Sequence, residues 1–182
     1  GVAHCRASLI ARMDADDVSL PTRFERQLAW MGDHPEIGIL GSAVTFFDDA
    51  GWEFVATQPL EHDDIACELL LGYTLLHPTV MIRSEVLRRH HLNYDVGYRV
   101  SQDHELWTRL AKVTRTGNLQ EPLVRMRDHS GKISCLQNDS QKAFSDKVRL
   151  RELSRLGIQL TERDAAIFNN ACSFRPLPSW RS

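Results

Sequence analysis

The sequence predicts an α/β layered domain that ends in a helical C-terminal segment. Apolar, β-branched runs alternate with segments of helical periodicity along the chain. The 182 residues are 42% hydrophobic and 25% charged, the composition of a globular domain that can bury a core. Internal repeats and low-complexity tracts are absent from the sequence. These observations together favour one layered domain.

The first half of the chain is expected to contain three strands and one amphipathic helix. Pro21 lies near the first helical position, where its missing N–H costs nothing. Phe24, Leu28 and Met31 follow at helical spacing and predict the buried face of this helix. Gly41 marks a bulge or a close approach within the central strand. The expected elements are strand 8–13, a helix from Pro21 to His34, core strand Ile37–Phe47 and its hairpin return Trp52–Thr57.

The second half is expected to be richer in helices. Ser101 is a suitable N-cap, Gly157 a natural residue after a helix end, and Thr161 with Asp164 resembles a capping pair. The expected elements are helix 62–71, β-type segment 79–83, helix 84–90, loop 93–97, helix 101–112, strand 123–126 and helices 141–157 and 161–172.

The bulk properties exclude several classes of protein. A formal net charge of -2 gives no reason to expect nucleic acid or an anionic membrane as a partner. The four cysteines lie far apart, which argues against a zinc site and favours reduced thiols in the cytoplasm. The apolar runs are too short to form a transmembrane segment.

Three carboxylates crowd the end of the first expected strand, in the run Asp14-Ala15-Asp16-Asp17. Like charges this close repel one another unless a positive charge lies between them. Hard oxygen ligands suit Mg²⁺ or Mn²⁺, above all where the ion also bridges substrate phosphates. Open α/β sheets bind ligands at the carboxyl ends of strands. The alternative is an acidic loop whose Asp17 helps to cap the next helix, and the cluster alone leaves both interpretations open.

A second polar cluster, at 101–107, places Asp103 in the first turn of a predicted helix. The helix dipole favours an anion there, and an ionised carboxylate is what a general base for a hydroxyl group requires. The alternative is a helix-start carboxylate without chemistry. His77 follows an apolar run and points to a cleft, with a structural hydrogen bond as the alternative. Arg127 and His129 offer cations for a diphosphate, with a solvated surface as the alternative.

Together these segments resemble a family-2 glycosyltransferase of the GT-A fold. The matching stretches occur in the family's order and cover most of the chain from Gly1 to about Phe168. They are similar to the strand and Asp-x-Asp motif (10–17), the Pro-x-Arg-x-x-x-Gln helix (21–27), the Gly-Ser strand (37–42), the His-Pro segment (77–81), the motif of the catalytic base (102–107) and the Arg-x-His…Ser stretch (127–134). Several short motifs in one order are more specific than any single one.

The resemblance implies a partial GT-A fold, a mixed sheet flanked by helices, in a hexosyltransferase-type enzyme. Such an enzyme moves a sugar from a nucleotide-diphosphate donor to an acceptor hydroxyl with inversion. The resemblance implies Asp14 and Asp16 as ligands of Mn²⁺ or Mg²⁺, Asp16 first, and Asp103 as the catalytic base. Its remaining candidates are Arg12, Asp17, Arg127 and His129 for the donor phosphates, and His77, Glu105 and Trp107 for the acceptor. Trp107 is at the same time expected in the core, with sugar stacking as the second interpretation.

Family members begin with a strand, a Pro-Thr-Tyr-Asn-like turn and βα units that hold the nucleotide base, and this sequence shows no counterpart. The expected organisation is a metal-binding and acceptor-side part at 1–135, a helical extension at 136–173 and a loose tail at 174–182. The resemblance implies bacterial cell-surface polysaccharide synthesis in the cytoplasm, with a saccharide or lipid-linked acceptor. A peripheral contact with the inner membrane stays open.

Two other functions stay open at this point. A transferase fragment that binds a partner without catalysis is favoured by the missing base-binding part. A metal-dependent phosphoryl-transfer enzyme would use Asp14 as its nucleophile. Such an enzyme also needs a lysine at a later strand end, and none of the four lysines clearly occupies such a position.

Overall fold

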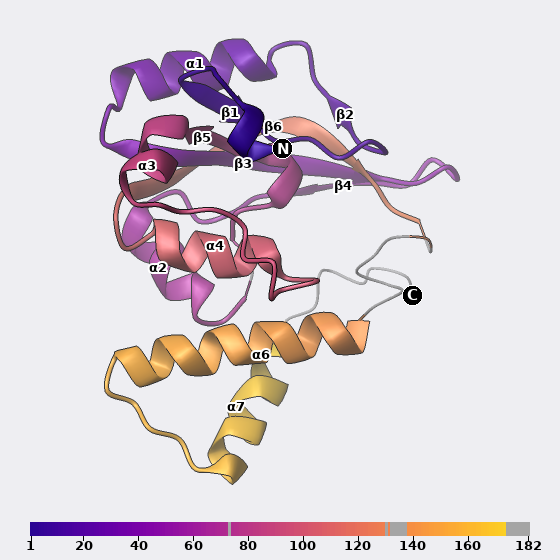
Figure 1. The fold of residues 1–182 in the computed structure, drawn as a ribbon. Helices are drawn as coiled ribbons and strands as arrows, with labels where there is room; N and C mark the ends of the chain where they lie inside the picture. The colour runs from indigo at the N-terminus through magenta and orange to yellow at the C-terminus, as the bar shows by residue number, and fades with distance from the viewer. Residues whose placement is uncertain (73, 130, 132–137, 174–182) are drawn as a thin grey trace.

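A six-stranded mixed sheet forms the centre of the structure (Figure 1). This computed structural model describes residues 1–72, 74–129, 131 and 138–173. The sheet order is β1-β5-β3-β6-β2, and β4 pairs with β3. The strands are β1 (Leu9–Ala11), β2 (Val18–Ser19), β3 (Ile37–Phe47), β4 (Glu53–Ala56), β5 (Met81–Arg83) and β6 (Arg115–Arg127). β3 and β6 run parallel and the other pairs antiparallel, so the predicted α/β class is confirmed.

The central strand β3 is paired along both edges. β6 accompanies it over its length, whereas β5 pairs with its first half and β4 with its second. A Cβ on Gly41 would lie 2.2 Å from Oδ1 of Asn118. The Asn118 amide is itself fixed, because Nδ2 donates to the carbonyls of Pro59 at 2.7 Å and Thr74 at 3.0 Å. The close approach predicted at Gly41 is therefore confirmed.

Strand β6 is longer than the sequence predicts. The expected strand 123–126 is only its last part, since β6 begins at Arg115. The first half was missed because it is polar and contains Gly117. It is a strand because β3 offers it a parallel partner, with a register shift beside the pair Ala43 and Pro122. β2, which pairs with the end of β6, was not predicted either.

The helices cover both faces of the sheet and add two further layers (Figure 1). α1 lies on one face and α2 and α4 on the other, while α6 lies beyond α4 and α7 beyond α6. Two short 3-10 turns occur at Val2–His4 and His77–Thr79. The helices are α1 (Arg23–Asp33), α2 (His62–Leu69), α3 (Ser84–Arg89), α4 (Gln102–Leu110), α6 (Asn138–Arg155) and α7 (Glu162–Ser173).

The predicted buried face of α1 is correct for Met31 and wrong for Phe24 and Leu28. Phe24 and Leu28 are 54% and 49% exposed, whereas Arg23 and Gln27 are fully buried beside Met31. The polar pair is buried because it satisfies backbone carbonyls of β3 and of the turn before β5. Gln27 Nε2 donates to the carbonyls of Thr79 at 2.8 Å and Leu40 at 3.3 Å, and Arg23 Nε donates to the Gln27 side-chain oxygen at 3.0 Å.

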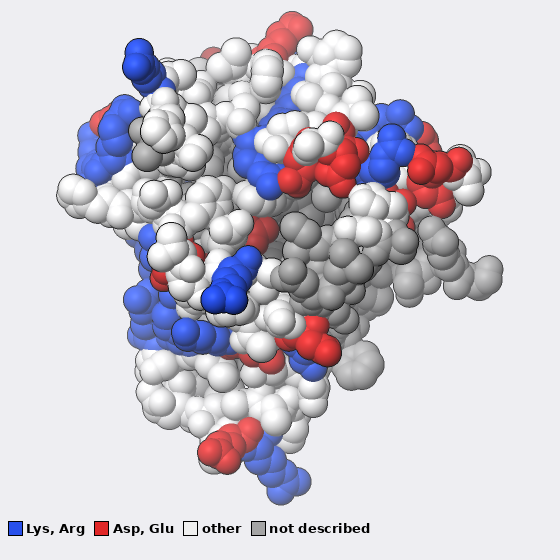
Figure 2. All heavy atoms as spheres, turned by 45° about the vertical axis from the view of Figure 1, so that its right-hand side comes forward, with Lys and Arg blue, Asp and Glu red and all other residues white. Residues whose placement is uncertain are grey.

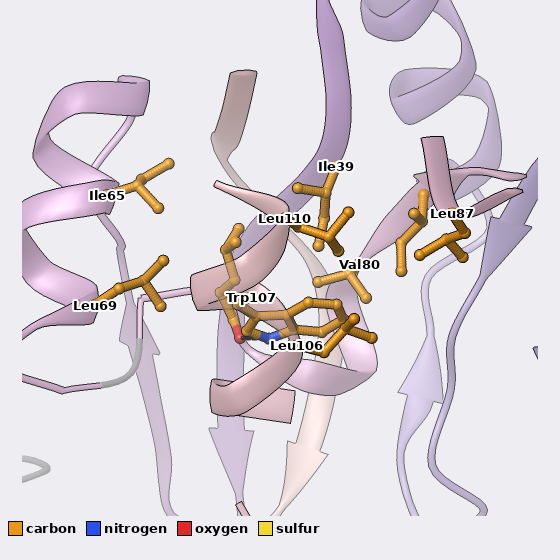
Figure 3. Close-up of a cluster of buried hydrophobic side chains, with 10 residues drawn as sticks. Ile39, Ile65, Leu69, Val80, Leu87, Leu106, Trp107 and Leu110 are labelled. Atoms are coloured by element: carbon orange, nitrogen blue, oxygen red, sulfur yellow. Dashed lines mark hydrogen bonds between the residues drawn. The ribbon is translucent and has the colours of Figure 1, made fainter. Parts of the chain in front are cut away.

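Helix α4 lies against the main apolar core (Figure 3). Its side chains pack with residues from β3, α2, α3 and the segment before β5. The labelled members of this cluster are Ile39, Ile65, Leu69, Val80, Leu87, Leu106, Trp107 and Leu110. Because most residues of α4 are buried, its first turn has a fixed position relative to the sheet.

The C-terminal helices end as the sequence predicts. Gly157 has φ +80°, the left-handed conformation expected after α6. Thr161 Oγ1 accepts the backbone N–H of Asp164 at 3.2 Å, as expected of a cap for α7. The proposed boundary at 135/136 and the tail 174–182 lie outside the described residues. Within the described ranges, each helix is too short or too polar to cross a bilayer.

Candidate functional site

The acidic loop 12–17 follows β1 and is anchored through its backbone. The Arg12 N–H donates to the Val80 carbonyl at 3.0 Å, which continues the pairing of β1 with the β5 segment. The buried Arg23 donates from Nη2 to the Arg12 carbonyl at 2.8 Å. Burial lowers the pKa of Arg23 to about 10, so it stays charged at neutral pH. The backbone of Arg12 at the start of the loop is therefore held in place, and the charged guanidinium of Arg23 contacts it.

Each carboxylate of this loop has a protein partner. Asp14 forms an ion pair with Arg12. Asp16 Oδ2 accepts a hydrogen bond from Nε2 of His129 at 3.0 Å. Asp17 Oδ1 accepts the backbone N–H of Arg127 at 3.0 Å. The loop is thus joined to the end of β6 and to His129 just after it, and the structure brings Asp16 and His129 together.

The side chain of Arg127 lies elsewhere. It forms an ion pair with Asp49 in the β3–β4 hairpin, and its guanidinium carbon lies 5.0 Å from the centre of the Phe47 ring. Its backbone N–H is the group that bonds Asp17 of the acidic loop. On the face drawn in Figure 2, acidic and basic side chains lie next to each other at the upper right. Such pairing lowers the repulsion that three neighbouring carboxylates would otherwise feel.

His77 lies in the 3-10 turn before β5, partly buried and in contact with two aromatic rings. Its Nε2 is 2.8 Å from the hydroxyl oxygen of Tyr94. Its ring centre is 5.9 Å from that of Trp107, in an edge-on arrangement. Tyr94 is not predicted from the sequence, since a single tyrosine in an expected loop carries no periodic or motif signal.

Helix α4 begins at Gln102, and Asp103 lies in its first turn as predicted, partly exposed. Ser101 occupies the N-cap position of α4 as predicted, but its side chain does not cap the helix. Ser101 has a left-handed backbone with φ +56°, and its side chain makes no capping hydrogen bond. The Ser101 hydroxyl instead donates to the Gln141 carbonyl at 3.0 Å and accepts from the Ser145 hydroxyl at 3.0 Å, both on α6.

Two predicted acceptor residues are buried. Trp107 is inaccessible, and its Nε1 donates to the Leu75 carbonyl at 3.1 Å, so the interpretation as a core residue is correct and stacking on a sugar is not. The Glu105 side chain is 2% exposed and accepts from Arg109 Nε at 2.9 Å and Arg151 Nη1 at 2.8 Å. Its carboxylate is saturated by these two cations, so contact with an acceptor is wrong for Glu105 as well.

The strand end and the helix start share one electrostatic environment. The pKa of His77 is lowered, chiefly by burial. Arg12 lowers it further, whereas the carboxylates of Asp103 and Asp14 act in the opposite direction. The same three charged groups act on Tyr94, whose pKa is raised to about 12, chiefly by burial. The charges of the acidic loop and of Asp103 therefore converge on the same two side chains.

The acidic loop fits a metal ion whose coordination is completed by oxygens of the substrate. The described residues contain no group of three or more His, Cys, Asp or Glu side chains placed to hold a metal by themselves. Mg²⁺ is commonly bound by one or two carboxylates plus substrate phosphates and water. The side chains of Asp14 and Asp16 are 38% and 49% exposed, so both can be reached from solvent. They fit such a shared site and do not fit an all-protein cage.

Comparisons with known proteins agree on one family. The sequence model of the family described as "Glycosyl transferase family 2" matches residues 1–100. The amylovoran biosynthesis glycosyltransferase AmsE of Erwinia amylovora is 31% identical over 74% of this chain and 50% of its own length. The O-antigen biosynthesis glycosyltransferase WbnJ of Escherichia coli is 32% identical over 71% of this chain and 51% of its own. The chain thus spans about half the length of these relatives.

Comparison with solved structures bears on the fold alone. The crystal structure of S. aureus TarS 1-349 in complex with UDP superposes with a TM-score of 0.60, at 11% sequence identity. The match covers 92% of this chain and 46% of that one. The prediction of a partial GT-A fold is confirmed by this likeness.

Proposed function

The chain belongs to glycosyltransferase family 2, and from this membership we propose that its acidic loop and the start of α4 form the two sides of one sugar-transfer site. The reaction proposed is transfer from a nucleotide-diphosphate sugar to an acceptor hydroxyl, with inversion. Relatives named for amylovoran and O-antigen biosynthesis support a substrate of the cell-surface polysaccharide class. The acceptor is then a saccharide or a lipid-linked saccharide.

One observation carries this proposal. Asp103, from the start of α4, and Asp14, from the end of β1, act electrostatically on the same His77. Nearly ninety residues separate the two carboxylates in the sequence, yet the fold brings both near one partly buried imidazole. A site of this kind can hold a diphosphate on one side and a nucleophilic hydroxyl on the other.

The donor side is assigned to the acidic loop. Asp16, with Asp14, would hold Mn²⁺ or Mg²⁺, which when bound supplies positive charge against the leaving nucleoside diphosphate. Arg12 and Asp17 border this position, and His129 contacts Asp16 directly. His129 must carry its proton on Nε2 in that contact, because an ionised carboxylate only accepts. His129 is therefore a hydrogen-bond donor, and it could donate to a phosphate oxygen when Asp16 binds the metal ion instead. Arg127 stays a donor-side candidate that would first have to leave Asp49.

The acceptor side is assigned to Asp103 and His77. As the acceptor oxygen bonds to the anomeric carbon, Asp103 takes the hydroxyl proton and the bond from that carbon to the diphosphate breaks. Attack from the side opposite the leaving group inverts the anomeric configuration. Asp103 is partly exposed, so an acceptor can reach it, and it lies in the first turn of α4.

Metal-dependent nucleotide binding tests the donor side. We expect calorimetric titration with UDP to show binding in the presence of Mn²⁺ and none after Asp16→Ala. Asp33→Ala, an exposed carboxylate at the far end of α1, is the matched control and should bind as the parent chain does. UDP binding that survives Asp16→Ala would show that the metal assignment is incorrect.

The alternative functions make different predictions in the same experiment. Absence of UDP binding by the parent chain, with or without Mn²⁺, would favour a non-catalytic binding module. A phosphoenzyme mimic trapped on Asp14 with beryllium fluoride would favour phosphoryl transfer. The cytoplasmic location, with a peripheral contact at the inner membrane, stays a prediction.

A further inference from the structure

Tyr94 lies in the segment between α3 and α4 and contacts His77. The Tyr94 hydroxyl oxygen lies 2.8 Å from His77 Nε2, and both rings meet Trp107 edge-on, at centre distances of 6.3 and 5.9 Å. Trp107 cannot move, because it is fully buried and its Nε1 donates to the Leu75 carbonyl. Three rings from three separate segments therefore form one cluster, with the tryptophan as its fixed member.

The backbone beside Tyr94 is fixed from α4. Arg109 Nη2 donates to the Asn93 carbonyl at 2.6 Å. The guanidinium of Arg109 is itself oriented by the buried Glu105, through hydrogen bonds of 2.9 and 3.0 Å to its two oxygens. Glu105 thus orients Arg109, and Arg109 in turn fixes the backbone that precedes Tyr94.

The direction of the Tyr94–His77 hydrogen bond follows from the chemistry of the two groups. Burial raises the pKa of Tyr94 to about 12, so the phenol keeps its proton at neutral pH. Burial lowers the pKa of His77, so the imidazole is neutral and one ring nitrogen is a free acceptor. A neutral imidazole nitrogen accepts more strongly than a phenol oxygen, whereas a phenol is the better donor. The bond therefore runs from the Tyr94 hydroxyl to Nε2 of His77.

We propose that Tyr94 is a positioning residue for His77, whose imidazole it holds as the neutral tautomer with the proton on Nδ1. Tyr94 fixes the ring, and the neutral ring then offers a hydrogen-bond donor on Nδ1. That this donor serves the acceptor rests on the proposed function above. The hydrogen bond and the tautomer are argued from the Tyr94–His77 contact and the burial of both side chains, independently of any acceptor.

The tautomer can be measured directly. In ¹H–¹⁵N spectra of the labelled chain at pH 7.5, with signals assigned through His77→Gln, we expect His77 to be protonated on Nδ1. Tyr94→Phe removes the hydroxyl and leaves the ring, and should shift the tautomer ratio about fivefold towards Nε2–H. Tyr98→Phe is the matched control, since Tyr98 is in the same segment but its ring packs against Phe144 at 5.5 Å. A parent chain with its proton on Nε2, or a ratio unchanged by Tyr94→Phe, would overturn the proposal.

Titration with UDP and Mn²⁺ separates this proposal from the proposed function. Tyr94→Phe should bind UDP with a Kd within about twofold of the parent, because the hydroxyl bonds His77 and not a carboxylate of the acidic loop. Loss of UDP binding in Tyr94→Phe, as severe as in Asp16→Ala, would place Tyr94 on the donor side and overturn its assignment. A parent chain that fails to bind UDP would count against the proposed function, while the NMR result would still decide the role of Tyr94.

Discussion

Replacing Glu105 by glutamine tests whether this residue stabilises the fold or contacts a substrate. The substitution keeps the size of the side chain and removes its charge. Glu105 is 2% exposed and receives hydrogen bonds from Arg109 and Arg151 at 2.8 to 3.0 Å. The variant leaves two guanidinium groups facing a neutral amide that also directs N–H groups towards them.

The magnitude follows from the exposure of the two arginines. Removing one partner of a fully buried ion pair costs about 3–5 kcal/mol. Arg109 and Arg151 retain 23% and 27% exposure, and Arg151 keeps Glu152 as a partner at 2.9 Å, so water and a second carboxylate offset part of the loss. We therefore expect Glu105→Gln to lower the free energy of unfolding by about 2 kcal/mol. For a chain of this length that corresponds to a melting temperature lower by about 4–8 °C.

Urea unfolding at pH 7, followed by circular dichroism and tryptophan fluorescence, measures this loss. The control is Glu85→Gln, which breaks an exposed pair with Arg89 on α3 and should cost less than about 0.5 kcal/mol. Equal losses in the two variants would refute the reasoning from burial. Undiminished stability of Glu105→Gln together with lost transferase activity would restore Glu105 to the acceptor site.

Three other substitutions, with Gly32→Ala as a control, probe the fold by urea unfolding. Gly41→Ala should cost about 2–3 kcal/mol, because its Cβ would lie 2.2 Å from Oδ1 of the fixed Asn118. Gly157→Ala should cost about 1 kcal/mol, because φ is +80° there. Gly32→Ala is the control for both: it lies within α1 with open space around it and should be neutral or stabilising, and a loss there equal to the other two would contradict both. Burial lowers the pKa of His104, so the unfolded chain binds more protons below pH 6.5 and stability should fall as the pH drops from there. His104→Gln should show a weaker decline between pH 7.5 and 5, and parallel curves would exclude this origin.

The sequence predicted the parts of the fold that depend on local patterns. The strand before Asp14, the strand Ile37–Phe47 and the ends of α6 and α7 follow from apolar runs, Gly157 and the Thr161 cap. β6 was only partly predicted, because its first half is a strand through pairing with β3 and not through its own residues.

The errors at α1 and α4 have a common physical origin. Hydrophobic periodicity assigns the buried face of a helix by apolar residues, yet Arg23 and Gln27 are buried to satisfy backbone carbonyls next to β1 and β5. The same holds for Glu105, whose partners come from its own helix and from α6. Partners distant in sequence decide whether a polar residue is buried, and a single sequence does not show them. Tyr94 was missed for the same reason, since its partner His77 is known only from the fold.

The link between Ser101 and α6 limits how this protein can be recombined with its relatives. Ser101 precedes Asp103, and its hydroxyl bonds Gln141 and Ser145 of α6, while Arg151 of α6 bonds Glu105. A chimera that exchanged the C-terminal helices as a separate module would remove these partners from the turn that carries the proposed base. Two stretches some forty residues apart, the start of α4 and the helix α6, therefore specify the position of Asp103 together. A chimera has to take both from the same parent.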